Sequence, residues 1–201
     1  MLPLDPQPAD AATEVTRLLS LAKAEDPRAS DRLLELLYDE LHAQAERAMA
    51  REPSGHTLQP TALVHEAWLR LVGAGERDWE SRAHFFRTAA RAMRRILIDR
   101  ARRVVQPKYG GGRLRVSLAG AIESEPAPSA AEDEVDLVAL DRALCGLEAF
   151  DARMADIVSM RFFGGLSVEE TGTALGVSTR TVKREWSVAK AWLHERLEQA
   201  Q

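Results

Sequence analysis

Apolar and small residues near the C-terminal end of the chain recur with helical spacing and predict two helices joined by a tight turn. The inward face of the first helix follows positions i, i+3, i+4 and i+7, at Val168, Thr171, Gly172 and Leu175. Ser167 is placed to cap this helix, and Glu170 stands where its carboxylate completes a capping box. Gly176 is expected to end the helix, whereas Gly172 within it is expected to cost about 0.5–1 kcal/mol relative to alanine.

The second helix of this pair divides into an apolar stripe and a cationic stripe. Its cap is Ser178, and its inward positions are Val182, Trp186, Ala189, Leu193 and Leu197. The opposite side carries only cations and hydroxyl groups in its first turns, which favours a helix-turn-helix that presents a recognition helix to DNA. The candidate DNA contacts are Ser178, Thr179, Arg180, Thr181, Lys183, Arg184 and Ser187. The alternative is an ordinary helical hairpin with a solvated charged face.

The helical period extends through the rest of the chain and predicts an all-α fold. It indicates helices at about residues 15–22, 30–50, 60–72, 82–103 and 137–162. Residues 113–118 are expected to be extended, but no convincing pair of strands is predicted.

The helix that begins at Pro60 is apolar on nearly all sides. Only His65, Glu66 and Arg70 form a narrow polar strip. Such a helix is either buried in a core or half-buried against a partner, and its pattern leaves both alternatives open.

The helix at 82–103 carries a row of arginines opposite an apolar face. Cations that follow phosphates, beside aromatic side chains that accept unstacked bases, suit single-stranded or melted nucleic acid. The candidate residues are Trp79, His84, Phe85, Phe86, Arg87, Arg91, Arg94 and Arg95. The alternative for both phenylalanines is a place in the core. Asp99 is the only acid near these arginines in the sequence.

Composition and charge change this picture in two ways. The chain has 201 residues, of which 45% are apolar, and this is consistent with two compact domains. The net charge of −4 hides a strong polarity, because residues 82–115 hold eleven Lys/Arg and one acid. Residues 121–136 hold six acids and no base.

The expected location is the cytoplasm. A single cysteine, Cys145, excludes an internal disulfide and favours a reducing compartment. No run of apolar residues is long enough to span a membrane, and the first ten residues do not resemble an export signal. No membrane contact is expected.

Motifs for catalysis or metal binding are incomplete. His65-Glu66 lacks the histidine four residues after His65 that a zinc protease needs, and Gly110–Gly112 lacks the lysine of a phosphate-binding loop. The five histidines are scattered, and one cysteine does not build a zinc site. We therefore expect no enzymatic activity, no cofactor, no metal and no small-molecule substrate.

Three stretches together resemble bacterial sigma factors of the extracytoplasmic-function (ECF) type. The segment 59–71, Gln-Pro-Thr-Ala-Leu-Val-His-Glu-Ala-Trp-Leu-Arg-Leu, resembles the polymerase-binding helix of that family. The segment 82–102 resembles its promoter-melting helix, and the segment 178–193 resembles its terminal recognition helix. The resemblance implies two helical domains on a flexible acidic linker. Its expected parts are a loose tail at 1–12, a first domain at 13–105, a linker at 106–134 and a second domain at 135–201.

The resemblance also implies a set of partners. The first domain would bind the clamp of core RNA polymerase through Leu63, Val64, His65, Glu66, Trp68 and Arg70. It would open the minus-ten promoter element with the segment 79–95, while the second domain would hold the minus-thirty-five element. The flap of the polymerase is expected as a further contact. The acidic linker would lie along the polymerase RNA channel, and an anti-sigma factor is left open as a partner. Many ECF members carry acids where this chain has Thr61-Ala62, so the polar share of clamp contact is expected to differ.

Two other classes of function remain as alternatives. A stand-alone helix-turn-helix regulator would use residues 1–105 to dimerise or to sense a ligand, and it would need a palindromic operator. An RNA-binding protein would use the cationic stretch 82–115.

Overall fold

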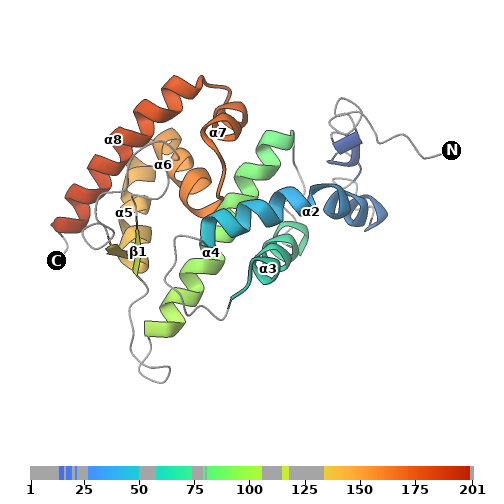
Figure 1. Cartoon of the computed structure of the whole chain (residues 1–201), viewed down its shortest axis with the longest axis horizontal. Coiled ribbons are helices and arrows are strands. Elements are labelled where there is room, and N and C mark those ends of the chain that lie inside the picture. Colours follow the sequence, from blue (N-terminus) through green and yellow to red (C-terminus); the bar gives the residue numbers. More distant parts are fainter. Residues whose placement is uncertain are drawn as a thin grey trace.

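The computed structural model describes residues 14–15, 17–19, 21, 27–49, 58–73, 79, 81–105, 115–117 and 134–199. Its elements are α2 (Pro27–Met49), α3 (Pro60–Gly73), α4 (Arg82–Val105), β1 (Arg115–Ser117), β2 (Glu134–Asp136), α5 (Leu137–Phe150), α6 (Ala152–Val158), the π-helix η3 (Ser159–Phe163), α7 (Val168–Leu175) and α8 (Thr179–Glu198). The described part is predominantly helical, and this confirms the predicted all-α class (Figure 1).

Three helices build the core of the N-terminal half. The long helix α2 contributes Leu33, Leu37 and Leu41, which are one or two helical turns apart and fully buried. Helix α3 packs against both α2 and α4. The described residues between 14 and 21 are helical, and Val15, Leu18 and Leu19 among them are buried.

Short helices with well-formed caps build the C-terminal half. Asp136 and Asp151 cap α5 and α6, because each carboxylate accepts a hydrogen bond from a backbone N–H three residues later. The chain then passes through η3 and reaches Gly165, whose φ of +62° favours glycine. Helices α5, α6 and α7 all contact α8.

The predicted helix-turn-helix is confirmed in detail. Ser167 and Glu170 form a reciprocal capping box at the start of α7. Gly176 ends α7 in the left-handed conformation, with φ of +66°, and Ser178 caps α8.

Gly172 has a structural role that its helical position alone did not suggest. A Cβ atom at this residue would lie 2.9 Å from the carbonyl oxygen of Val177. Its Cα therefore lies directly under the turn that joins α7 to α8. The expectation that Gly172 is a fault is wrong, since the close approach of the turn requires a residue without a side chain.

The expectation that the chain has no strand pair is also wrong. Strands β1 and β2 pair antiparallel, with Arg115 opposite Asp136 and Val116 opposite Val135. Each strand has only three residues, which is too short for an alternating pattern to stand out. Strand β1 lies within the predicted linker 106–134, and β2 begins at the last residue of that linker. Only residues 115–117 and 134 of the linker are described. The predicted tail 1–12 lies outside the described residues.

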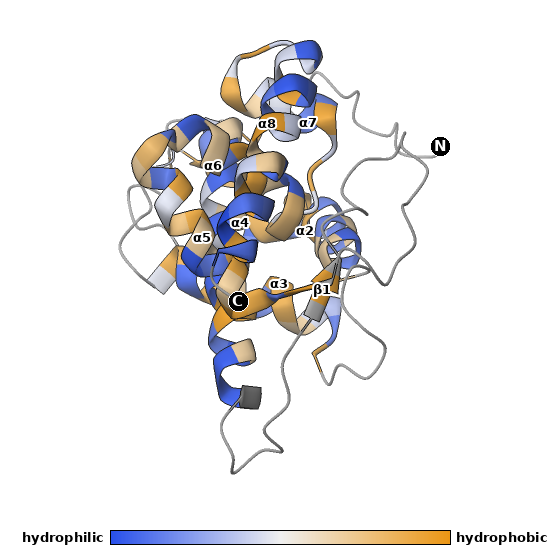
Figure 2. Cartoon of the chain, turned by 90° about the vertical axis from the view of Figure 1, so that its left-hand side faces the viewer, coloured by the Kyte–Doolittle hydropathy of each residue, from blue (hydrophilic) through white to orange (hydrophobic). Residues whose placement is uncertain are grey.

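Helix α4 lies between the two groups of helices. It contacts α3 on one side and α5, η3 and α7 on the other. Figures 1 and 2 agree on this arrangement from two directions. Figure 2 also shows hydrophilic and hydrophobic residues interleaved along the helices, which is the amphipathic pattern that the sequence predicts. The domain boundaries expected from the sequence remain predictions.

Candidate nucleic-acid and polymerase interfaces

The outward face of α8 is open to solvent along its first turns. Arg180, Lys183 and Arg184 are exposed there, together with the hydroxyl residue Ser187. The Ser178 hydroxyl accepts a hydrogen bond from the Thr181 backbone N–H at 3.1 Å, which fixes the start of the helix. The predicted inward stripe of α8 is buried, as expected from its spacing.

An ion pair that sequence reasoning missed ties the back of α8 to α6. Glu185 is buried, and its two carboxylate oxygens accept hydrogen bonds from the Arg153 guanidinium at 2.7 and 2.9 Å. A bidentate ion pair of this kind fixes the relative orientation of the guanidinium and the carboxylate as well as the distance between them. Glu185 also accepts a 3.4 Å hydrogen bond from the neighbouring Arg184. The pair therefore helps to set the rotation of α8 about its own axis.

Helix α3 buries three of the six residues expected to contact polymerase. Leu63, Val64 and Trp68 are in the core. The core alternative left open by the sequence is therefore the correct one for these three side chains.

The surface of α3 carries a different set of residues. His65 and Glu66 are exposed, and Leu69 beside them is 69% exposed. Leu69 was not among the predicted contacts, although a leucine three and four residues after two polar positions was a visible signal. Arg70 is half-exposed and donates a 3.0 Å hydrogen bond to Asp99 on α4. The exposed patch on α3 consists of His65, Glu66 and Leu69.

The aromatic residues expected to stack on bases are buried together. Phe85 packs edge-on against Trp79, with ring centroids 5.3 Å apart, and against Phe86 at 5.2 Å. All three side chains belong to the core. The Trp79 indole nitrogen has no hydrogen-bond partner among the described residues, and neither has Nδ1 of the half-buried His84. In this conformation the aromatic faces are not available to a nucleic acid.

The first arginine of α4 has its ion-pair partner within the N-terminal half. Arg82 forms an ion pair with Glu40 of α2 and lies over the Phe86 ring at 5.2 Å. Burial raises the pKa of Glu40, and the charge of Arg82 opposes that shift.

Four other arginines of α4 have carboxylate partners far away in the sequence. Arg91 donates a 2.7 Å hydrogen bond to Asp156, and Arg87 lies 4.0 Å from the same carboxylate. Arg94 and Arg102 pair with Asp141 at 2.7 and 3.1 Å. Arg95 is exposed. The partners were missed because they lie 39 to 69 residues away, where sequence spacing carries no information about contact.

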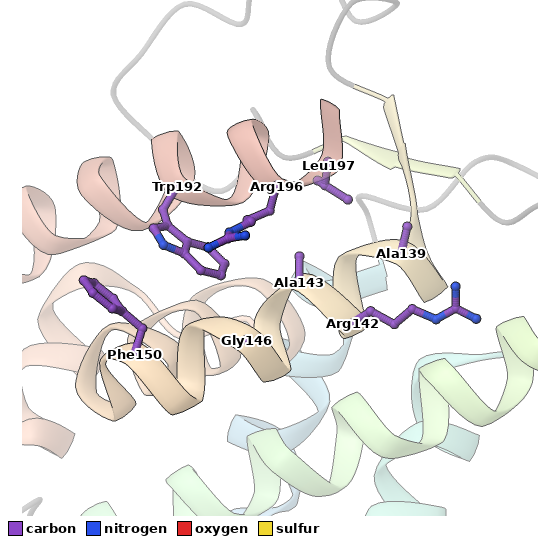
Figure 3. Close-up of a pocket in the computed structure, with 8 residues that line it drawn as sticks. All are labelled: Ala139, Arg142, Ala143, Gly146, Phe150, Trp192, Arg196 and Leu197. Carbon is purple, nitrogen blue, oxygen red and sulfur yellow. The ribbon is translucent and has the colours of Figure 1, made fainter. Parts of the chain in front are cut away.

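An open groove of about 580 Å³ lies between α5 and α8 (Figure 3). The Phe150 and Trp192 rings stack at its edge, with centroids 6.4 Å apart, and Phe150 is 70% exposed. Arg196 lies 5.1 Å over the Trp192 ring. The groove is lined by Ala139, Arg142, Ala143, Gly146, Phe150, Trp192, Arg196 and Leu197. No sequence pattern predicts this groove, because its walls come from two helices far apart in the chain.

Two other kinds of site are not found in the part of the chain that the structure describes. No three His, Cys, Asp or Glu side chains gather there as a metal site would require. Among the same residues, every helix is too short or too polar to cross a bilayer.

A family model described as ECF sigma factor matches residues 12–199. The chain belongs to the ECF sigma factor family. None of the curated proteins matches it. Among solved structures, the chain is similar to CnrH in the structure of CnrH in complex with the cytosolic domain of CnrY. The identity is 19% and the TM-score 0.39, over 94% of this chain and 99% of that chain.

The two predicted DNA-binding surfaces of this ECF sigma factor thus differ in how accessible their cations are. The cationic face of α8 is exposed, whereas most arginines of α4 are paired with carboxylates. Membership of the family supports a role as a transcription initiation factor and gives no support to an enzymatic one.

Proposed function

We propose that this sigma factor binds core RNA polymerase, recognises promoter DNA and melts the minus-ten region. The observation that carries the proposal is the helix-turn-helix, whose second helix is capped, anchored from behind and cationic on its outer face. Its cationic face alone would also suit a stand-alone regulator. The family supports the sigma factor over that regulator.

The minus-thirty-five element is assigned to the first turns of α8. A recognition helix enters the major groove with its N-terminal residues first, so Arg180 is nearest to the base edges. An arginine in that position can bridge both acceptors on a guanine edge. Lys183, Arg184 and Ser187 follow along the helix and are assigned to bases or phosphates further along the groove.

Polymerase binding is assigned to two surfaces. The exposed patch His65, Glu66 and Leu69 combines an apolar side chain with polar neighbours, and we assign the clamp contact to it. The apolar groove between α5 and α8 is assigned to the flap. Its residues on α8, from Trp192 to Leu197, lie beyond the DNA-contacting turns, so both contacts are possible at once.

Melting of the minus-ten element is assigned to α4 and the segment before it. The arginines of α4 would hold phosphates, because guanidinium groups pair with phosphate oxygens regardless of sequence. Stacking on unpaired bases requires Trp79, Phe85 and Phe86 to leave the core. The Trp79 indole nitrogen and His84 Nδ1 have no hydrogen-bond partner within the described part of the chain. This favours this end of α4 as the place that opens, because buried unpaired polar groups are costly.

Two further expectations remain predictions. An anti-sigma factor would be a natural partner for a protein with exposed polymerase-binding surfaces. The acidic linker is expected to lie in the RNA channel of the polymerase.

The deciding experiment combines a pull-down with core polymerase and run-off transcription from genomic fragments. We expect the chain to co-purify with core polymerase and to direct initiation from asymmetric promoters. Binding to a palindromic duplex without polymerase, together with no promoter-specific transcript, would support the stand-alone regulator instead.

A further inference from the structure

Two carboxylates of the C-terminal half hold four arginines of α4. Asp156 on α6 faces Arg87 and Arg91, and Asp141 on α5 faces Arg94 and Arg102. Along α4 the two Asp156 pairs come first and the two Asp141 pairs follow, over about four turns in all. No other described segment brings so many opposite charges together across the two halves of the molecule.

These contacts differ from ordinary surface ion pairs. The side chains of Asp141, Asp156 and Arg94 are only 12%, 13% and 11% exposed. Arg94 also donates a 3.2 Å hydrogen bond to the backbone carbonyl of Asp141, and its guanidinium lies 5.9 Å over the Phe163 ring. Partly buried charges with several partners are screened by salt far less than exposed pairs.

The backbone that joins η3 to α7 packs closely against the N-terminal half. A Cβ at Gly164 would lie 2.6 Å from the Cβ of Ala90 on α4, and a Cβ at Gly165 would meet the carbonyl group of Gln44 on α2. The turn between η3 and α7 therefore packs directly against α2 and α4. Arg47 of α2 adds an ion pair with Glu170 of the capping box, at 3.3 Å.

A carboxylate and a phosphate offer the same guanidinium group the same kind of acceptor, so they compete for it. We propose that Asp141 and Asp156 take the place of DNA phosphates on α4. In the free sigma factor they keep the two halves of the molecule packed together, and we call this the closed state. This inference rests on the proposed function, because it assigns α4 to promoter DNA. DNA then binds α4 only in molecules whose two halves have separated, and the apparent affinity falls by the fraction that is open.

The test neutralises both acids without changing their shape, in the variant Asp141→Asn/Asp156→Asn. A matched control, Glu169→Gln/Glu198→Gln, removes the same number of charges from exposed positions of α7 and α8. Small-angle X-ray scattering measures the radius of gyration of each full-length chain. Fluorescence anisotropy measures the affinity for a labelled duplex with an unpaired bubble.

We expect the double variant to expand by several ångströms and to bind the bubble duplex about tenfold more tightly than the wild type. The control should do neither, which separates the loss of specific ion pairs from a general loss of negative charge. Circular dichroism checks folding, and Asp156→Asn alone serves as the second variant if the double variant is not folded.

The proposal is overturned if the variant and the control behave alike, or if expansion and tighter binding do not occur together. Run-off transcription by the wild type with core polymerase distinguishes a failure of this inference from a failure of the proposed function. A wild type that initiates at promoters but shows no closed state would refute only this inference. A wild type that closes but never initiates would refute the proposed function.

Discussion

A pair of leucine truncations on α3 separates core residues from polymerase contacts. Leu63 is fully buried between α2 and α4, so Leu63→Ala leaves a cavity that the neighbouring helices fill only in part. Truncation of a buried leucine costs about 2–5 kcal/mol, a large share of the roughly 5–15 kcal/mol that keeps such a protein folded. Leu69 lies six residues later and is largely exposed, so Leu69→Ala should change stability by less than about 0.5 kcal/mol.

For binding to core polymerase, Leu69→Ala should have the larger effect and Leu63→Ala the smaller one. Full burial of a leucine contributes about 1.5–3 kcal/mol, and roughly two thirds of the Leu69 surface remains to be buried. A contact at Leu69 is therefore expected to contribute about 1–2 kcal/mol, which is about 5–30-fold in the dissociation constant. Leu63→Ala should leave this affinity unchanged in the molecules that remain folded.

Urea unfolding followed by circular dichroism measures the stability of each variant, and a fluorescence titration with core polymerase measures binding. The midpoint of Leu63→Ala should fall by at least about 1 M, and that of Leu69→Ala should not move measurably. If Leu63→Ala is as stable as the wild type but loses polymerase, Leu63 is a polymerase contact and not a core residue. If Leu69→Ala binds as well as the wild type, the exposed patch is not the clamp contact.

Three shorter predictions concern the helix-turn-helix. Gly172→Ala should destabilise the chain in thermal unfolding in spite of the better helix propensity of alanine, because the new methyl group meets the carbonyl of Val177; a raised melting temperature would contradict this. Arg180→Ala should cost about 1–3 kcal/mol and relax sequence preference in a selection from randomised duplexes, whereas Arg196→Ala, at the groove, should leave the selected sequence unchanged. Glu185→Gln should weaken specific binding more than non-specific binding, since it loosens the anchor behind α8; an equal loss on both DNAs would argue against a positioning role.

The sequence by itself determined where most of the helices lie and how the helix-turn-helix begins, turns and is capped. Caps and periodic faces depend on residues at most seven positions apart, and a chain near those positions has few alternatives. Ser167, Glu170, Gly176 and Ser178 therefore predicted the helix-turn-helix correctly, and the stretch around residues 59–71 pointed to the family. These features would be the same in almost any tertiary arrangement.

Tertiary structure decided which side of each helix is covered and which charges meet. The pattern of α3 allowed burial on several sides, and only the position of α2 and α4 selected Leu63 for the core and Leu69 for the surface. The arginines of α4 had only Asp99 nearby in the sequence, and Asp141 and Asp156 became partners of four of them only when the two halves packed together. Burial and ion pairing depend on distances in space, which residues far apart along the chain do not encode locally.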